Sequence, residues 1–200
     1  MNRSKAFTLV ELLIVIGLLG AIALIVISAI NPIEQSNRAR DTRFKADGSQ
    51  LISALDRYFV SHDEFPWTTL TPATTTEMAY GFVSARTLGV GLCGNAGCTT
   101  DGGLLTSNEL KTEFRNRDFV KNTASATTDK KLFIGKATLS SSSVYACFVP
   151  LSKSIRDKAC ADSKVYLVTA SGTRTPQSCI ATDTWVTAGD TTAWMICVPE

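Results

Sequence analysis

Residues 5–20 of the chain read KAFTLVELLIVIGLLG, and the apolar run that begins here decides the fold of the N-terminal part. From Phe7 to Ile30 the sequence holds one ionisable side chain, Glu11. As a helix these residues would extend about 36 Å, more than the roughly 30 Å thickness of a bilayer's hydrocarbon core. The run therefore predicts a membrane-spanning helix.

A secretory signal peptide is the alternative interpretation, because Arg3 and Lys5 precede the run and small residues such as Ala21 and Ala23 lie within it. Cleavage after Ala23 would leave the apolar sequence LIVISAI on the mature protein. The carboxylate of Glu11 also does not suit the uncharged core of a signal peptide. We therefore favour a helix that the mature protein retains.

Glu11 needs a partner, because a carboxylate at the centre of a membrane helix costs about 2.5–3.5 kcal/mol, and somewhat less near the helix end. No Lys, Arg or His lies between Phe7 and Asn31. Cutting the chain before Phe7 would create a positive α-amino group, which could pair with Glu11 of a neighbouring copy. The position of Glu11 thus predicts an assembly of several copies.

This stretch resembles the class III signal of type IV pilins and type II secretion pseudopilins. A short basic leader ends in Ala6, where that family usually has glycine, and FTLVELLIVI follows from Phe7. The resemblance implies that a membrane prepilin peptidase cuts between Ala6 and Phe7 and methylates the new amine of Phe7. It also implies that Glu11 is needed for assembly.

The resemblance further implies a structural subunit of a type IV pilus-like filament, not an enzyme, with no cofactor, metal or catalytic site. Its partners would be copies of itself, the prepilin peptidase, the pilus or secretion assembly machinery and the cytoplasmic membrane. The subunit would cross that membrane once with its C-terminus outside, then enter an extracellular pilus. Minor pilins, secretion pseudopilins, and adhesive or DNA-binding pilins are alternatives, as is a monomeric membrane-anchored protein or enzyme.

Beyond the apolar run, Asn31-Pro32 predicts a kink or break, since proline removes a helix hydrogen bond. Residues 33–61 then predict a second helical stretch that packs on a domain and is closed by Phe65-Pro66. Its apolar stripe has helical spacing and consists of Phe44, Leu51, Ile52, Leu55, Tyr58 and Phe59. The polar stretch NRARDTRFKAD has two interpretations, a solvated face or inter-subunit ion pairs.

Four segments of the last 70 residues are rich in β-branched and aromatic residues, and DTWV at 183–186 is a weaker strand candidate. Strands in succession without intervening helices predict an antiparallel meander. We therefore expect an α+β, pilin-like fold in which a long N-terminal helix packs on a C-terminal antiparallel sheet. Its expected parts are a leader (1–6), a membrane and assembly helix (7–32), an amphipathic half of the helix (33–66), a connecting region with a disulfide loop and a short helix (67–130), and the sheet with a C-terminal disulfide loop (131–200).

Six cysteines lie in the last 108 residues, and their even number behind an apolar N-terminus predicts disulfides in an oxidising compartment. A metal site is the alternative, but the chain has no CxxC pair and its one histidine, His62, is far upstream. Short loops favour pairing of sequence neighbours: Cys93 with Cys98, Cys147 with Cys160, and Cys179 with Cys197. The resemblance to pilins, which commonly close this region with a disulfide, supports the last pair most.

Composition bounds the remaining possibilities. With 44% hydrophobic and 19% charged residues the chain is not disordered, and its net charge of +2 falls to zero without Arg3 and Lys5, which excludes a general polyanion binder.

The sequence predicts a short helix over 106–122, with Thr106 and Glu109 as a capping box. A local basic excess here is either solvated surface or a patch for DNA, made of Lys111, Arg115, Arg117, Lys121, Lys130, Lys131 and Lys136.

Residues 89–98, GVGLCGNAGC, have the G-x-G-x-x-G spacing of a dinucleotide site, but the third glycine falls between two cysteines. We therefore expect a loop closed by Cys93–Cys98. His62 beside Asp63 and Glu64 fits a helix end better than a catalytic site, because no nucleophile can be assigned to it.

Overall fold

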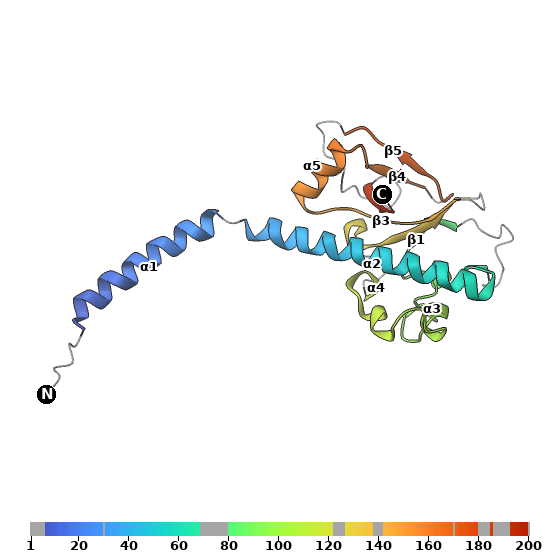
Figure 1. Cartoon of the computed structure of the whole chain (residues 1–200), viewed down its shortest axis with the longest axis horizontal. Coiled ribbons are helices and arrows are strands. Elements are labelled where there is room, and N and C mark those ends of the chain that lie inside the picture. The colour runs from blue at the N-terminus through green and yellow to red at the C-terminus, as the bar shows by residue number, and fades with distance from the viewer. Residues whose placement is uncertain are drawn as a thin grey trace. The chain divides into compact units, whose positions relative to one another are not determined.

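The computed structural model describes residues 7–29, 31–68, 80–121, 127–137, 142–169, 171–179, 185 and 193–199. The chain divides into two compact units, Met1–Ser36 and Asn37–Glu200. Figure 1 labels most of the helices and strands of both.

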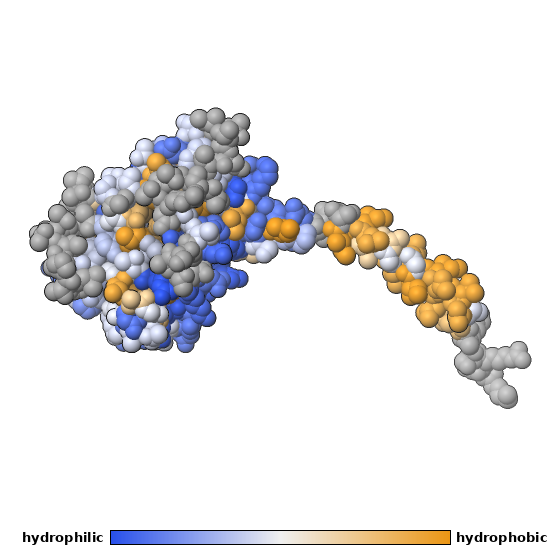
Figure 2. Space-filling model, turned by 180° about the vertical axis from the view of Figure 1, so that it is seen from behind, coloured by the Kyte–Doolittle hydropathy of each residue, from blue (hydrophilic) through white to orange (hydrophobic). Residues whose placement is uncertain are grey.

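The first unit is built on α1 (Leu9–Ala29), a helix of 21 residues that extends about 31 Å. Its segment Leu9–Ile27 is long and apolar enough to cross a membrane. Every side chain from residue 7 to residue 27 is exposed on the single chain, and the hydrophobic colour covers most of this helix in Figure 2. The predicted apolar helix is therefore present.

The second helix, α2 (Pro32–His62), begins at the proline that was expected to interrupt the first. Asn31 caps α2, because its Oδ1 accepts the Glu34 N–H at 3.2 Å. Proline suits the first helical position, where its missing N–H would have no partner anyway. The predicted break at Asn31-Pro32 is confirmed.

α2 ends at His62, three residues before Phe65. Asp63 has a φ of 58°, and its N–H donates to the carbonyl of Phe59 at 2.8 Å. This left-handed residue is a common way to end a helix, so the helix stops before the expected Phe65-Pro66 signal.

The second unit holds a six-stranded sheet, and its paired strands are antiparallel, as predicted. The order in the sheet is β1-β2-β3-β6-β4-β5. The strands are β1 (Tyr80–Ser84), β2 (Phe133–Lys136), β3 (Val144–Phe148), β4 (Tyr166–Val168), β5 (Arg174–Pro176) and β6 (Trp194–Val198).

The prediction of a simple meander is wrong, because β6 inserts between β3 and β4 and helix α5 (Lys153–Ala161) lies between β3 and β4 in the chain. β1 and β5 were not predicted. Of the weak candidate strand at 183–186, the described residues include only Trp185, which is buried.

Two hydrophobic cores lie on the two faces of the sheet. The first core contains Phe44, Leu51 and Leu55 of α2, and the second contains Ala159 of α5 with Met195 of β6. Figure 1 shows α2 and α5 on opposite sides of β3. Alternation along the strands supplies both cores, since successive side chains point to opposite faces.

Gly48 brings α2 close to the sheet. A Cβ at this position would lie 3.1 Å from the Cβ of Ala146 and 3.2 Å from Cγ2 of Val198. These two residues are partners on β3 and β6, next to the partnered pair Cys147 and Cys197. A side chain at this position would crowd both strands, so glycine suits the place where the helix crosses them.

The single helix predicted over 106–122 is wrong. Short helices replace it: α3 (Gly103–Thr106), the 3₁₀ turn η2 (Thr112–Asn116) and α4 (Asp118–Lys121), with two further 3₁₀ turns at Leu88–Val90 and Thr128–Lys130. Thr106 ends a helix instead of capping one, and Glu109 accepts a hydrogen bond from Arg57 Nε at 2.9 Å. Tertiary contacts override the local signal here.

All six cysteines are in disulfides. The bond Cys93–Cys98 is confirmed, and it closes the glycine-containing loop. The pairings Cys147–Cys160 and Cys179–Cys197 are wrong: the bonds are Cys147–Cys197 and Cys160–Cys179. The physical reason is the position of β6 beside β3, which places Cys147 directly opposite Cys197 with a Cα–Cα distance of 4.0 Å.

Candidate assembly site at the start of the apolar helix

Thr8 and Glu11 form a reciprocal cap at the N-terminus of α1. The backbone N–H and the hydroxyl of Thr8 donate to Glu11 Oε2 at 3.0 and 2.9 Å. In return the Glu11 N–H donates to Thr8 Oγ1 at 3.2 Å. This is a capping box, which satisfies amides that the helix itself leaves without partners. The carboxylate is thereby held at the helix end where the macrodipole favours negative charge.

Thr8 was not predicted as a partner of Glu11, because its side chain carries no positive charge. The spacing T-x-x-E before an apolar run is a readable capping signal, and it stands at residues 8–11. Glu11 thus has a local partner, contrary to the expectation that none lies within the run. The cap needs no residue before Thr8, so cleavage before Phe7 would leave it intact.

The residues predicted for processing lie at the edge of the described chain. Phe7 precedes the cap, and 82% of its surface is exposed. Ala6 lies outside the described residues, so the bond expected to be cut is not described. The pairing of a Phe7 amine with Glu11 of another copy stays a prediction.

The surface of α1 is apolar and exposed along the helix. Large apolar side chains along it range from 46% exposed at Val15 to 78% exposed at Leu9. A Cβ added at Gly17 or Gly20 would meet nothing within 4 Å. Exposed apolar surface of this extent needs lipid or other helices around it, and small residues let helices approach closely.

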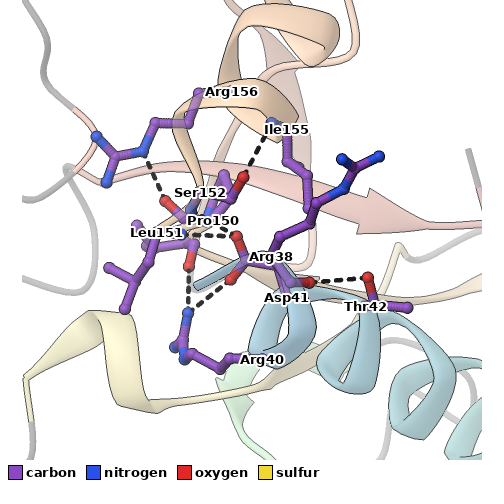
Figure 3. A network of polar contacts seen from close by, with 10 residues as sticks. Arg38, Arg40, Asp41, Thr42, Pro150, Leu151, Ser152, Ile155 and Arg156 are labelled. Atoms are coloured by element: carbon purple, nitrogen blue, oxygen red, sulfur yellow. Dashed lines mark hydrogen bonds and ion pairs between the residues drawn. The ribbon is translucent and has the colours of Figure 1, made fainter. Parts of the chain in front are cut away.

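Two acidic residues of the polar stretch of α2, Asp41 and Asp47, are buried and so do not lie on the predicted solvated or inter-subunit face, whereas Arg38, Arg43 and Lys45 are exposed. Asp41 is 1% exposed, and its Oδ2 accepts the backbone N–H groups of Leu151 and Ser152 at 2.9 and 2.8 Å. Its Oδ1 accepts from Arg40 at 2.8 Å. Figure 3 shows the carboxylate pointing from α2 into the turn before α5.

Asp47 is a second buried carboxylate on α2, 3% exposed and 3.4 Å from a guanidinium nitrogen of Arg117. Burial raises the pKa of Asp47, and the positive charges of Arg117 and Arg43 oppose this shift. Both carboxylates therefore join α2 to the rest of its own domain, and neither faces a neighbour.

The basic residues of 111–136 do not form one patch. Arg115 pairs with Asp101 at 2.8 Å and Arg117 with Asp47 at 3.4 Å. Lys136 is 2% exposed, and burial lowers its pKa. The described exposed cations of this set are Lys111, Lys121 and Lys130.

His62 stacks on Tyr58 with ring centroids 4.0 Å apart. Its Nδ1 lies 3.1 Å from the Tyr58 carbonyl oxygen and 2.8 Å from the Ser61 hydroxyl. These contacts fit the expected role at a helix end. The described residues hold no group of three or more His, Cys, Asp or Glu side chains placed to bind a metal.

Comparison with protein families matches residues 1–27 to the prokaryotic N-terminal methylation motif. Searches of curated proteins and of solved structures found no match. The motif supports a pilin-like or pseudopilin-like subunit with a structural role, and it implies processing by a prepilin peptidase and contact with assembly machinery. Together with the apolar helix it fits membrane anchoring followed by display at the surface. Residues 1–27 thus carry the class III signal peptide of type IV pilins and pseudopilins.

Proposed function

We propose that this protein is a structural subunit of a type IV pilus-like filament. The observation that carries the proposal is a capped carboxylate, Glu11, at the start of a fully exposed apolar helix within a methylation motif. A monomeric anchored protein needs the apolar helix but has no use for a charge inside it.

Processing comes first in the proposed mechanism. Prepilin peptidase cuts between Ala6 and Phe7 and methylates the Phe7 amine. The new ammonium group then pairs with Glu11 of a neighbouring copy by a charge-assisted hydrogen bond. The capping box supports this step, because Thr8 holds the Glu11 carboxylate at the helix end without supplying a positive charge. The ion pair would fix the axial register of one helix on the next.

Assembly then moves α1 from lipid into a bundle of identical helices. Packing of apolar faces and close approach at Gly17 and Gly20 would stabilise the bundle. Before assembly the subunit would span the cytoplasmic membrane once with its C-terminus outside, where the three disulfides fit an oxidising compartment. Afterwards the second unit would coat an extracellular filament.

A minor pilin or a secretion pseudopilin would share all these features, and subunit abundance in isolated filaments separates them from a major pilin. DNA binding has less support, because ion pairing and burial take Arg115, Arg117 and Lys136 out of the predicted patch.

The test is intact mass and N-terminal sequencing of protein sheared from the surface of cells that express it. A chain that begins at methylated Phe7 in filaments supports processing and assembly together. A chain that begins near Leu24 would make this a secreted domain with an ordinary signal peptide. A chain that keeps its first residues in the membrane would contradict the proposal.

A further inference from the structure

A cavity of about 300 Å³ opens between α2 and α5 beside the central strands β3 and β6. Its apolar lining comes from Phe148 of β3 with Ile196 and Val198 of β6. Figure 3 shows the Arg38 side chain extending from α2 alongside Ile155 of α5, and both residues line this cavity. The volume is at the lower end of those that bind small ligands or inserted side chains.

Positive charge surrounds this apolar lining. Its four cationic side chains come from both helices and the segment after α5: Arg38, Lys45, Lys158 and Lys164. Two carboxylates also line it, but the oxygens of Asp41 already bind Arg40 and the amides of Leu151 and Ser152. The exposed Asp162 is the other. The cavity therefore suits an apolar group that is surrounded by negative charge.

The far end of α2 presents such a group. Val60 is 84% exposed, and among the described residues of 37–200 the other exposed large hydrophobic side chain, Leu88, reaches only 38%. Asp56 lies one turn before Val60 on the same helix, and Asp63 and Glu64 follow in the chain directly after the helix ends at His62. Arg57 is the cationic residue nearest to Val60 in the sequence, and its Nε pairs with Glu109 Oε2 at 2.9 Å.

We propose that the cavity between α2 and α5 receives the Val60 end of α2 from a second copy of this chain. The valine would contact the apolar lining, and the surrounding carboxylates would face the cations of the rim. Such complementarity sets orientation and register more than affinity. The inference rests on the proposed filament and names one contact between its subunits.

One chain cannot make this contact with itself. Lys45 and Val60 lie on the same helix, about 22 Å apart along its axis, and Arg38 and Val60 about 33 Å apart. The contact joins two different surfaces, and each copy carries both. Every copy can therefore bind one neighbour through its cavity and another through its Val60 end. Head-to-tail contacts of this kind form open helical arrays, and here each copy would be offset along α2 by about 22–33 Å, the axial separation of the two surfaces.

Carbodiimide treatment of sheared filaments tests the contact, because this reagent joins a lysine amine directly to a carboxylate. Peptide mass spectrometry should find Lys45, Lys158 or Lys164 coupled to Asp56, Asp63 or Glu64. Lys45 and Asp56 are about 16 Å apart along the helix, so their direct coupling requires two copies. Coupling of the three lysines only to other carboxylates would assign the cavity another occupant and overturn the inference.

Charge reversal gives a second test. Lys158→Glu should lower filament yield by about tenfold, since repulsion replaces attraction at the rim, and Asp56→Lys in the same chain should restore it. Val60→Ser should lower the yield from the opposite surface. Lys121→Glu is the matched control, because Lys121 is exposed and does not line the cavity.

The outcomes separate this inference from the proposed function. Wild-type chains that never form filaments would contradict both. Filaments that form normally with Lys158→Glu and Val60→Ser, without the expected couplings, would overturn the contact and leave the filament proposal standing. Circular dichroism of each full-length variant in detergent confirms that a lost filament does not reflect a lost fold.

Discussion

The Asp41 carboxylate on α2 accepts the backbone N–H of Ser152, the N-cap of α5, at 2.8 Å. The contact joins residues 111 positions apart in the chain. Ser152 in turn caps α5, because its hydroxyl accepts the Ile155 N–H at 3.3 Å. A carboxylate on one helix therefore fixes where another helix begins.

Replacing Asp41 should destabilise the domain. Asp41→Ala leaves the amides of Leu151 and Ser152 without their acceptor and leaves the Arg40 guanidinium with only the Val149 carbonyl, and we expect the free energy of unfolding to fall by about 3 kcal/mol. Urea unfolding followed by tryptophan fluorescence measures this. The control is Asp157→Ala on α5, whose exposed ion pair with Lys153 should contribute at most about 0.5 kcal/mol. Equal effects of the two changes would contradict the role of Asp41.

Two substitutions separate the cap from the charge at the start of α1. Glu11→Gln keeps the capping geometry and removes the charge, whereas Thr8→Val removes the hydroxyl and keeps the charge. If the ion pair with the Phe7 amine sets the register, Glu11→Gln inserts in the membrane and makes no filaments. Glu11→Ala should do the same. Thr8→Val should still assemble, with a helix end weakened by about 1 kcal/mol. Counting filaments by electron microscopy decides, and normal filaments from Glu11→Gln would refute the register role.

The buried side chain of Tyr80 should make the free energy of unfolding fall in strong alkali. Burial raises its pKa from 10.0 to about 12, where its ring stacks on Trp67 with centroids 4.5 Å apart. The folded state keeps the proton that the unfolded state gives up, so stability declines as the pH rises from about 10 through 12. Near-ultraviolet absorbance should show a tyrosine that ionises at about pH 12, and Tyr80→Phe should remove this step and flatten the decline.

The disulfides should differ in their contribution to stability. The loop closed by Cys147–Cys197 spans 50 residues and that closed by Cys93–Cys98 spans 5. Loop-closure entropy predicts losses of about 4 and about 2 kcal/mol when each is replaced by a pair of serines. Peptide mapping without reduction should recover Cys147 linked to Cys197 and Cys160 linked to Cys179. Cys147 linked to Cys160 would contradict the arrangement of β3 and β6.

Gly48→Ala should destabilise the domain although alanine favours helices by about 1 kcal/mol. The added methyl would lie 3.1 Å from Ala146 Cβ, a group fixed to the strand backbone. Overpacking of this kind costs about 1–3 kcal/mol, so we expect a net loss of up to about 2 kcal/mol in a thermal unfolding experiment. Ser49→Ala on the exposed side of the same turn serves as the control.

Local patterns predicted much of this fold. The apolar run of α1, the proline at its end and the stripe from Phe44 to Tyr58 depend on near neighbours in the sequence, and each is present. The cap formed by Thr8 could also have been predicted from the sequence, because the spacing of Thr8 and Glu11 is a capping signal.

Non-local features could not be predicted in this way. Nothing near Cys147 in the sequence indicates that a strand 50 residues later lies beside it. α5 buries only Ala159 and so has little apolar pattern, and β5 is a short strand, Arg-Thr-Pro, without a large apolar side chain. The polar sequence around Asp41 looked solvated because its partners, the amides of Leu151 and Ser152, belong to the backbone and have no signature in the side chains.

The position of Gly48 has a mechanical meaning for a helix that continues toward an anchored segment. Pulling along α2 would slide the helix over β3 and β6, and a shift by one turn would bring a residue with a side chain over Ala146 and Val198. The disulfide beside that pair keeps the two strands from spreading to let it pass. The close packing at Gly48 therefore gives a steric resistance to pulling along the helix axis, in addition to the resistance from polar contacts.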